Sequence, residues 1–229
     1  MKIKMSGTLY VVATPIGNLE DITLRAIEVL KQVDLIAAED TRHTKILTNR
    51  YGISTPLTSY FQYNEIKKTE PLIAALKKGK NIALVSDSGT PGISDPGFTI
   101  IREAIREGIS VVPIPGPSAF LTALSISGMP THKFAFEGFL SNKSAHRRKQ
   151  LEALKQEERT IIMYESPHRL LKTLNDVMEI MGDINIVCAR ELTKKFEELR
   201  REKVSQTIKH FSETRILGEF IIIFNLKNP

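Results

Sequence analysis

Short apolar runs alternate along the first half of the chain with longer segments in which apolar residues recur every three or four positions. The runs are rich in β-branched residues and end in turn-forming residues, as buried strands do; they span 8–13, 34–38, 81–85 and 110–114. The segments between them have the period of amphipathic helices; they span 20–33, 70–80 and 98–108. This order, with its continuous apolar strands, predicts a parallel sheet covered by helices.

The second half continues the alternation, with a half-exposed strand and a strongly charged helix. The pattern predicts strands over 133–139, 159–165, 184–191 and 218–226. It predicts helices over 118–128, 143–157 and 167–182. The fold class is therefore α/β, and we expect two α/β lobes, residues 1–117 and 118–229, joined by a short link.

Three predicted strands of the first lobe end in loops dense in glycine and proline: ATPIGN (13–18), SDSGTPGISDPG (86–97) and IPGPSA (114–119). The carboxyl ends of parallel strands share one edge, and open α/β sheets bind ligands there. We therefore expect the three loops to line one ligand cleft. The G-x-G-x-x-G, G-x-x-x-x-G-K-[ST] and G-x-S-x-G patterns are missing from these loops, which removes the main support for dinucleotide, ATP and hydrolase functions.

The distribution of positive charge favours a polyanionic partner. The formal net charge is +6, and the stretch 143–149 has four fixed positive charges and a histidine with no acid. A second, more dilute basic group consists of Lys194, Lys195, Arg200, Arg201 and Lys203. Both groups favour nucleic acid as a partner. The alternative for each is the solvated face of a helix.

Other features place the protein among cytoplasmic ones. The apolar run 9–13 is too short for the core of a signal peptide, and no run reaches the eighteen residues of a membrane span. The single cysteine, Cys188, excludes an internal disulfide and a multi-cysteine zinc site, and the five histidines have no ligand spacing. The sequence thus predicts neither a membrane segment nor a metal site.

Six motifs stand in the order found in one known family: LYVVATPIGNLEDITLRA, AEDTRHT, ALVSDSGTPGISDPG, PIPGPSA, YESPHRLL and ARELTKKFEE. On these motifs, which cover nearly the whole chain, it resembles the ribosomal small subunit methyltransferase I family of the tetrapyrrole methylase superfamily. That family methylates the ribose 2′-oxygen of a cytidine in the decoding region of 16S rRNA. Its members often have a further short C-terminal domain after a segment like GEFIIIF, and this chain stops a few residues beyond that segment.

The resemblance implies two α/β lobes of the tetrapyrrole methylase type, with S-adenosylmethionine in the cleft between them, and a homodimer. By motif, the cofactor-binding residues are Pro15, Gly17, Asp87, Gly89, Thr90, Pro91, Gly92, Ile93, Ser94, Ser118, Ala119, Tyr164 and Glu165. Glycine suits this role because it accepts positive φ and lets backbone approach a ligand closely. The carboxylate of Asp87, or a carbonyl nearby, would favour the positive sulfonium.

Methyl transfer to a hydroxyl gains from a general base that removes the proton. The candidates are the acids at strand ends, Asp40, Glu39 and Glu165, with Glu191 as a further one. The alternative for each acid is a salt bridge or a helix cap. Asp40 in particular has the type and place of an N-cap for a helix that follows it.

The same resemblance makes the small ribosomal subunit, through its 16S rRNA, the expected partner. The candidate RNA-binding residues are Arg42, Lys143, Arg147, Arg148, Lys149, His168, Arg169, Arg190 and Lys194. Such side chains bind phosphate without reading sequence, so affinity should fall with salt. Two other functions stay open: C-methylation of a tetrapyrrole, and a cofactor-binding assembly factor without catalysis.

Overall fold

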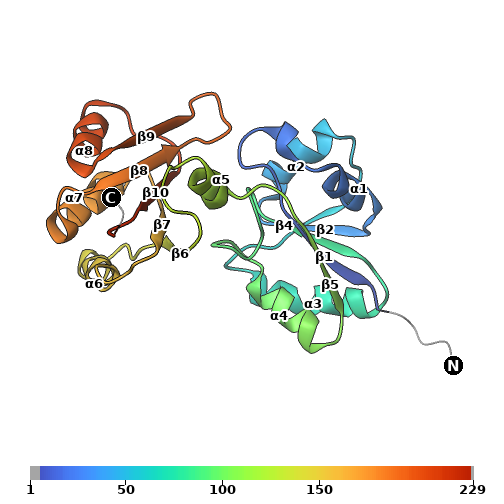
Figure 1. Cartoon of the computed structure of the whole chain (residues 1–229). Helices are drawn as coiled ribbons and strands as arrows, with labels where there is room; N and C mark the ends of the chain where they lie inside the picture. The colour runs from blue at the N-terminus through green and yellow to red at the C-terminus, as the bar shows by residue number, and fades with distance from the viewer. Residues whose placement is uncertain (1–5, 228–229) are drawn as a thin grey trace. The chain divides into compact units, whose positions relative to one another are not determined.

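The computed structural model describes residues 6–227 and contains two units, each with a five-stranded sheet (Figure 1). The first unit ends at Ser118 and the second begins at Ala119. The elements of the first unit are β1 (Thr8–Val12), a 3-10 turn (Leu19–Asp21), α1 (Leu24–Gln32), β2 (Leu35–Ala38), α2 (Thr41–Arg50), β3 (Leu57–Ser59), α3 (Glu65–Lys77), β4 (Ile82–Val85), α4 (Phe98–Arg106) and β5 (Ser110–Ile114). Those of the second are α5 (Ala119–Ser125), β6 (Phe134–Phe139), α6 (Ser144–Leu154), β7 (Thr160–Glu165), α7 (Leu170–Met181), β8 (Asn185–Arg190), β9 (Glu198–Lys203), α8 (Val204–Glu213) and β10 (Phe220–Phe224). The predicted α/β class is confirmed.

The first sheet has the strand order β3-β2-β4-β1-β5, and its strands pair in parallel. Successive residues of a strand point to opposite faces. On one face Val12, Ala83 and Val85 join a core with α1 and α2. On the other, Leu9 and Leu84 join a core with α3 and α4. The predicted parallel sheet covered by helices is confirmed.

This topology gives the first sheet a switch point between β1 and β4. The two strands are neighbours, yet β1 leads to α1 on one face and β4 leads to α4 on the opposite face. The chain therefore continues from these two strands to opposite faces of the sheet. Open α/β sheets bind ligands at such a point.

The second sheet has the order β6-β7-β10-β8-β9, and only β6 and β7 run parallel among its pairs. Helices α6, α7 and α8 pack against one face through a core that includes Leu151, Leu174 and Phe211. The short helix α5 contacts β7 and β10. At its end, the guanidinium of Arg201 donates hydrogen bonds to the carbonyls of Ile126 and Ser127, which fixes α5 to β9.

The second basic group is not a helix face. Arg200, Arg201 and Lys203 lie on the edge strand β9. Within it, Arg200 bonds Glu202 at 2.6 Å, so part of the positive charge is neutralised inside the strand. Charged side chains on an edge strand also oppose pairing with another chain.

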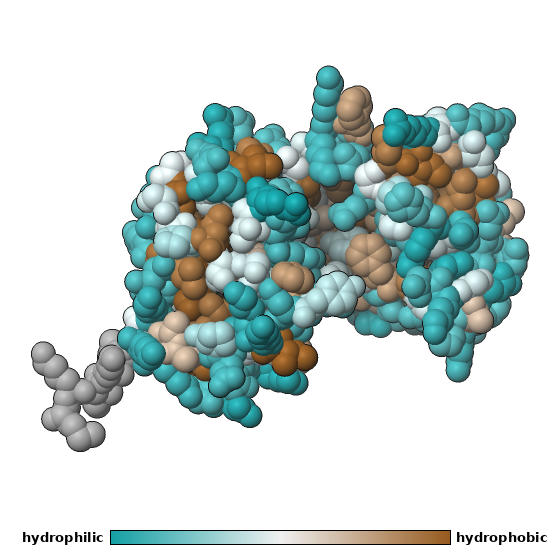
Figure 2. Space-filling view, turned by 180° about the vertical axis from the view of Figure 1, so that it is seen from behind, coloured by the Kyte–Doolittle hydropathy of each residue, from teal (hydrophilic) through white to brown (hydrophobic). Residues whose placement is uncertain are grey.

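The surface carries hydrophobic side chains among the polar ones, as Figure 2 shows for one face. Those with more than half of their surface exposed include Leu24, Tyr63, Ile66, Phe98 and Phe196. No helix within residues 6–227 is long and apolar enough to cross a membrane.

Candidate functional site

The loops that follow β1, β4 and β5 are in contact at the carboxyl edge of the first sheet. Thr14 and Gly89 exchange two backbone hydrogen bonds, of 2.8 and 3.0 Å, across the switch point. The hydroxyl of Thr14 also donates to the carbonyl of Ser86. From the same β4 loop, the hydroxyl of Thr90 donates to the carbonyl of Pro117 at 3.5 Å. The sequence-based expectation that these loops share one edge is thus met.

Unusual backbone angles concentrate in the β4 loop. Gly89, Gly92 and Gly97 have φ of +78°, +82° and +146°, and Ser94 has φ of +62° although it is not glycine. A β-carbon at Gly97 would lie 3.1 Å from the backbone nitrogen of Gly92, closer than ordinary contact. The loop therefore folds tightly on itself, and its glycines are required by geometry.

The other cofactor candidates of the first unit lie in or beside these loops. Pro15, Pro91 and Gly89 are buried, whereas Gly17, Ile93 and Ser94 are exposed. Ser118 ends the unit.

Three acidic residues meet where the loops after β2 and β4 are in contact. The backbone N–H of Asp40 donates to Oδ1 of Asp87 at 2.9 Å. In return, the backbone N–H of Asp87 donates to Oε2 of Glu39 at 3.3 Å. The candidate acids Glu39 and Asp40 of the β2 loop and Asp87 of the β4 loop are thus brought together, a contact that the sequence did not predict.

Asp40 is the N-cap of α2 and an ion-pair partner. Its side chain accepts the backbone N–H of Arg42 and pairs with the guanidinium of Arg42 at 2.7 Å. These hydrogen bonds lower the pKa of Asp40 to about 2. A carboxylate with so low a pKa is a weak proton acceptor near neutrality. The structure thus favours a helix cap over a general base as the role of Asp40. Arg42, a candidate for RNA binding, is engaged in an ion pair within the chain.

Sequence reasoning missed His43 at this edge. It lies in the first turn of α2, and its Nδ1 is 4.0 Å from Oδ1 of Asp87. The signal was present in the motif AEDTRHT, where a histidine follows two acids directly after a buried strand.

Glu165, a candidate of the second unit, is buried at the end of β7. Its carboxylate accepts hydrogen bonds from the backbone of Ser166 (2.7 Å) and the hydroxyl of Thr173 (2.5 Å) and pairs with Arg169 (2.9 Å). Arg169 also donates to the carbonyl of Leu140. Both residues are thereby engaged in joining β7 to the start of α7, an arrangement that favours structural roles over general base and RNA contact.

Tyr164, the other β7 candidate, belongs to an aromatic group. Its ring packs edge-on against Phe136, at 5.0 Å between centroids, and is tilted against Phe139 at 5.4 Å. Phe136 in turn stacks on Phe120, which follows the candidate Ala119 in α5. Phe139 is 46% exposed. Partly exposed aromatic faces of this kind are suited to stacking against a base.

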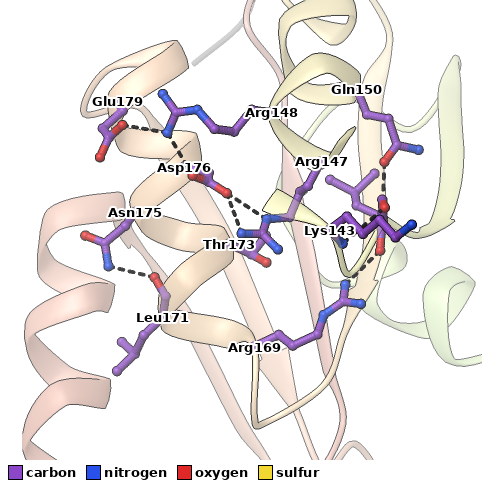
Figure 3. A network of polar contacts seen from close by, with 12 residues as sticks. Lys143, Arg147, Arg148, Gln150, Arg169, Leu171, Thr173, Asn175, Asp176 and Glu179 are labelled. Atoms are coloured by element: carbon purple, nitrogen blue, oxygen red, sulfur yellow. Dashed lines mark hydrogen bonds and ion pairs between the residues drawn. The ribbon is translucent and has the colours of Figure 1, made fainter. Parts of the chain in front are cut away.

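The structure corrects the assignment of Arg147 to RNA binding. Its side chain is 4% exposed and bonds the carboxylate of Asp176 at 2.6–2.7 Å (Figure 3). The neighbouring Arg148 bonds both Asp176 and Glu179 across the same two helices, α6 and α7. Leu151, which lies on the same face of α6, is buried as well. Arg147 therefore belongs to the interior.

The remaining RNA candidates divide into exposed and paired ones. Lys143, Lys149 and His168 are exposed. Arg190 pairs with Glu198 at 2.6 Å and Lys194 with Glu191 at 2.8 Å.

Comparison with known proteins identifies the family to which this chain belongs. Residues 8–207 match the sequence model of a family described as tetrapyrrole (corrin/porphyrin) methylases. A protein of Thermotoga maritima named ribosomal RNA small subunit methyltransferase I is 50% identical over 96% of this chain and 99% of its own length. A Bacillus subtilis protein of the same name is 52% identical over 97% of this chain and 76% of its own length. The chain belongs to the ribosomal RNA small subunit methyltransferase I family.

Solved structures show how widely this family's fold is shared. Diphthine synthase superposes with a TM-score of 0.76 at 15% identity, over 96% of this chain and 90% of the other. A Thermus thermophilus uroporphyrin-III C-methyltransferase, solved with S-adenosylhomocysteine, superposes with a TM-score of 0.68 at 16% identity, over 96% and 98%. At such identities the likeness concerns the fold alone. The tetrapyrrole methylase fold expected from the motifs is confirmed.

Proposed function

We propose that the protein transfers the methyl group of S-adenosylmethionine to the ribose 2′-hydroxyl of a cytidine in the decoding region of 16S rRNA. The observation that supports this most is the 50% sequence identity, over 99% of the relative's length, to a protein named ribosomal RNA small subunit methyltransferase I. The converging loops at the switch point of the first sheet supply a site whose chemistry fits such a reaction.

The residues at this edge suit the cofactor. Its sulfonium is positive, and the carboxylates of Glu39 and Asp87 lie at the loops that would hold it. Its amino-acid and ribose groups need hydrogen-bonding partners, which closely approaching backbone at Gly89 and Gly92 offers. In the second unit, Ala119 and the backbone at Tyr164 and Glu165 remain the proposed contacts. When bound, the cofactor supplies a methyl carbon activated for displacement.

The chain's main contribution is to hold the 2′-oxygen in line with that carbon. Positioning of this kind supplies on the order of 7–11 kcal/mol of the barrier. Peptide groups fixed by the Thr14–Gly89 hydrogen bonds are suited to it because they do not rearrange during the reaction.

Binding of the rRNA would use exposed positive charge. With Arg147 assigned to the interior, Lys143 directly before α6 and Lys149 within it remain exposed, and His168 is exposed before α7. Partly exposed rings of the Phe139 and Tyr164 group offer a surface for an unstacked base. Recognition of the 2′-hydroxyl itself would distinguish RNA from DNA.

The test is transfer of labelled methyl from S-adenosylmethionine to small ribosomal subunits that lack the modification. The proposal predicts label in RNA as an alkali-resistant dinucleotide, since a 2′-O-methyl group blocks hydrolysis at its own nucleotide. Parallel reactions contain naked 16S rRNA or a porphyrinogen. Label in the porphyrinogen and not in RNA would establish C-methylation of a tetrapyrrole and contradict the proposal. Cofactor binding without any transfer would point to a non-catalytic assembly factor.

A further inference from the structure

His43 lies where the loops after β2 and β4 meet. It belongs to the first turn of α2, and 57% of its side chain is exposed. Its Nδ1 is 4.0 Å from Oδ1 of Asp87, within ion-pair range and slightly longer than a hydrogen bond. Catalytic hydrogen bonds are often long before the substrate binds.

The carboxylate beside His43 is held in place by backbone. Oδ1 of Asp87, the atom that faces His43, also accepts the backbone N–H of Asp40 at 2.9 Å. The backbone N–H of Asp87 is itself fixed by Glu39. Because Asp87 is held on both sides, it can orient an imidazole through Nδ1 and leave Nε2 for another partner.

The other charged groups near His43 are less suited to accept a proton. The guanidinium of Arg42 is bonded to Asp40, and that pairing lowers the pKa of the Asp40 carboxyl to about 2. Glu39 is occupied by the Asp87 backbone. An imidazole, by contrast, ordinarily titrates near neutrality, where a general base is most effective.

We propose that His43, oriented by Asp87, is the general base that accepts the proton of the ribose 2′-hydroxyl. The inference rests on the proposed function. As the 2′-oxygen bonds to the methyl carbon, the bond from that carbon to sulfur breaks and its electron pair stays on sulfur, so neutral S-adenosylhomocysteine leaves. The hydroxyl proton passes to Nε2 of His43. The resulting imidazolium is stabilised by the Asp87 carboxylate and returns its proton to solvent.

The experiment compares single-turnover methylation of small subunits by the wild type, His43→Ala, His43→Gln and the control His132→Gln. His132 is also exposed but lies before β6, far along the chain from the loops described. Both His43 variants should transfer methyl at least 100-fold more slowly, the lower range of a general base. Imidazole added to His43→Ala should restore part of the rate. The control should keep the wild-type rate.

Three further measurements separate a base from a structural residue. Affinities for S-adenosylhomocysteine and for the subunit should stay within about threefold of wild type in the His43 variants. The wild-type rate should rise with pH through the range where imidazole titrates and then level off, and this dependence should disappear in His43→Gln. In NMR spectra that resolve the histidine signals of the wild type, the His43 signal should shift when S-adenosylhomocysteine and the subunit bind. The His132 signal should not shift.

The outcomes distinguish this inference from the function on which it rests. If the wild type methylates the ribose and His43→Ala does so within fivefold at every pH, His43 is not the base and the proposed function stands. If His43→Ala loses cofactor affinity in parallel with rate, the residue has a binding role and the inference is overturned. If the wild type transfers no methyl to RNA, the proposed function fails and the inference fails with it.

Discussion

Removing the carboxylate of Asp176 tests whether Arg147 is an interior residue. Asp176→Ala leaves the Arg147 guanidinium, whose side chain is 4% exposed, without its anion. Breaking a buried ion pair in this way typically costs about 3–5 kcal/mol, because the remaining charge cannot regain its hydration. Glu179→Ala is the matched control, since it removes the other acid bonded by Arg148 from the same helix but at a site 62% exposed. Exposed pairs contribute about 0–1 kcal/mol.

The assay is urea unfolding followed by far-ultraviolet circular dichroism. With a slope of about 2 kcal/mol per molar urea, Asp176→Ala should move the midpoint of the second unit's transition down by about 1.5–2.5 M. Glu179→Ala should move it by less than about 0.5 M. A double variant, Arg147→Met with Asp176→Leu, should recover most of the loss, since apolar residues can replace a buried pair. Equal midpoints for Asp176→Ala and Glu179→Ala would refute the reasoning, as would weakened RNA binding in a stably folded Arg147→Met variant.

Two further predictions concern titrating groups. Burial raises the pKa of the Cys188 thiol to about 12, so the native protein at pH 8 should not react with Ellman's reagent over an hour, while the unfolded chain should react at once; rapid native labelling would contradict the burial. Arg42 lowers the pKa of Asp40 from 3.8 to about 2, so the stabilisation from this pair is present above pH 4 and lost as pH falls through 2. An NMR titration should therefore find the Asp40 midpoint near 2 in the wild type and clearly higher in Arg42→Ala, which keeps only the backbone hydrogen bonds to this carboxylate; a wild-type midpoint near 4 would show that the pair does not form.

Much of the fold could be predicted because the strands of a sheet covered on both faces are continuous apolar runs. NIALV and SVVPI became β4 and β5 nearly residue for residue. Helix α3 was predicted from Glu70 onwards, but it begins at Glu65 and Pro71 lies inside it. Strand β9 escaped prediction because its residues, ELRREK, are charged at nearly every position. Only pairing with β8 makes it a strand.

The candidate site shows a similar division. That the glycine-rich loops share an edge followed from a parallel sheet, and the Thr14–Gly89 hydrogen bonds bear it out. Contacts between residues distant in sequence could not be predicted. The partner of Arg147 is 29 positions away on another helix, so its positive charge was assigned to RNA. The closeness of His43 to Asp87 likewise depends on β2 and β4 being neighbours in the sheet.

The central claim is that the loops at the switch point of the first sheet bind the cofactor. Isothermal titration with S-adenosylhomocysteine tests it most directly on Gly89→Val and Gly108→Val. Both glycines have positive φ, of +78° and +66°, so both variants carry similar backbone strain, but Gly108 lies in the loop between α4 and β5 at the opposite edge of the sheet. The account predicts affinity at least tenfold weaker for Gly89→Val and unchanged for Gly108→Val, with similar melting temperatures. Wild-type affinity in a folded Gly89→Val variant would contradict it.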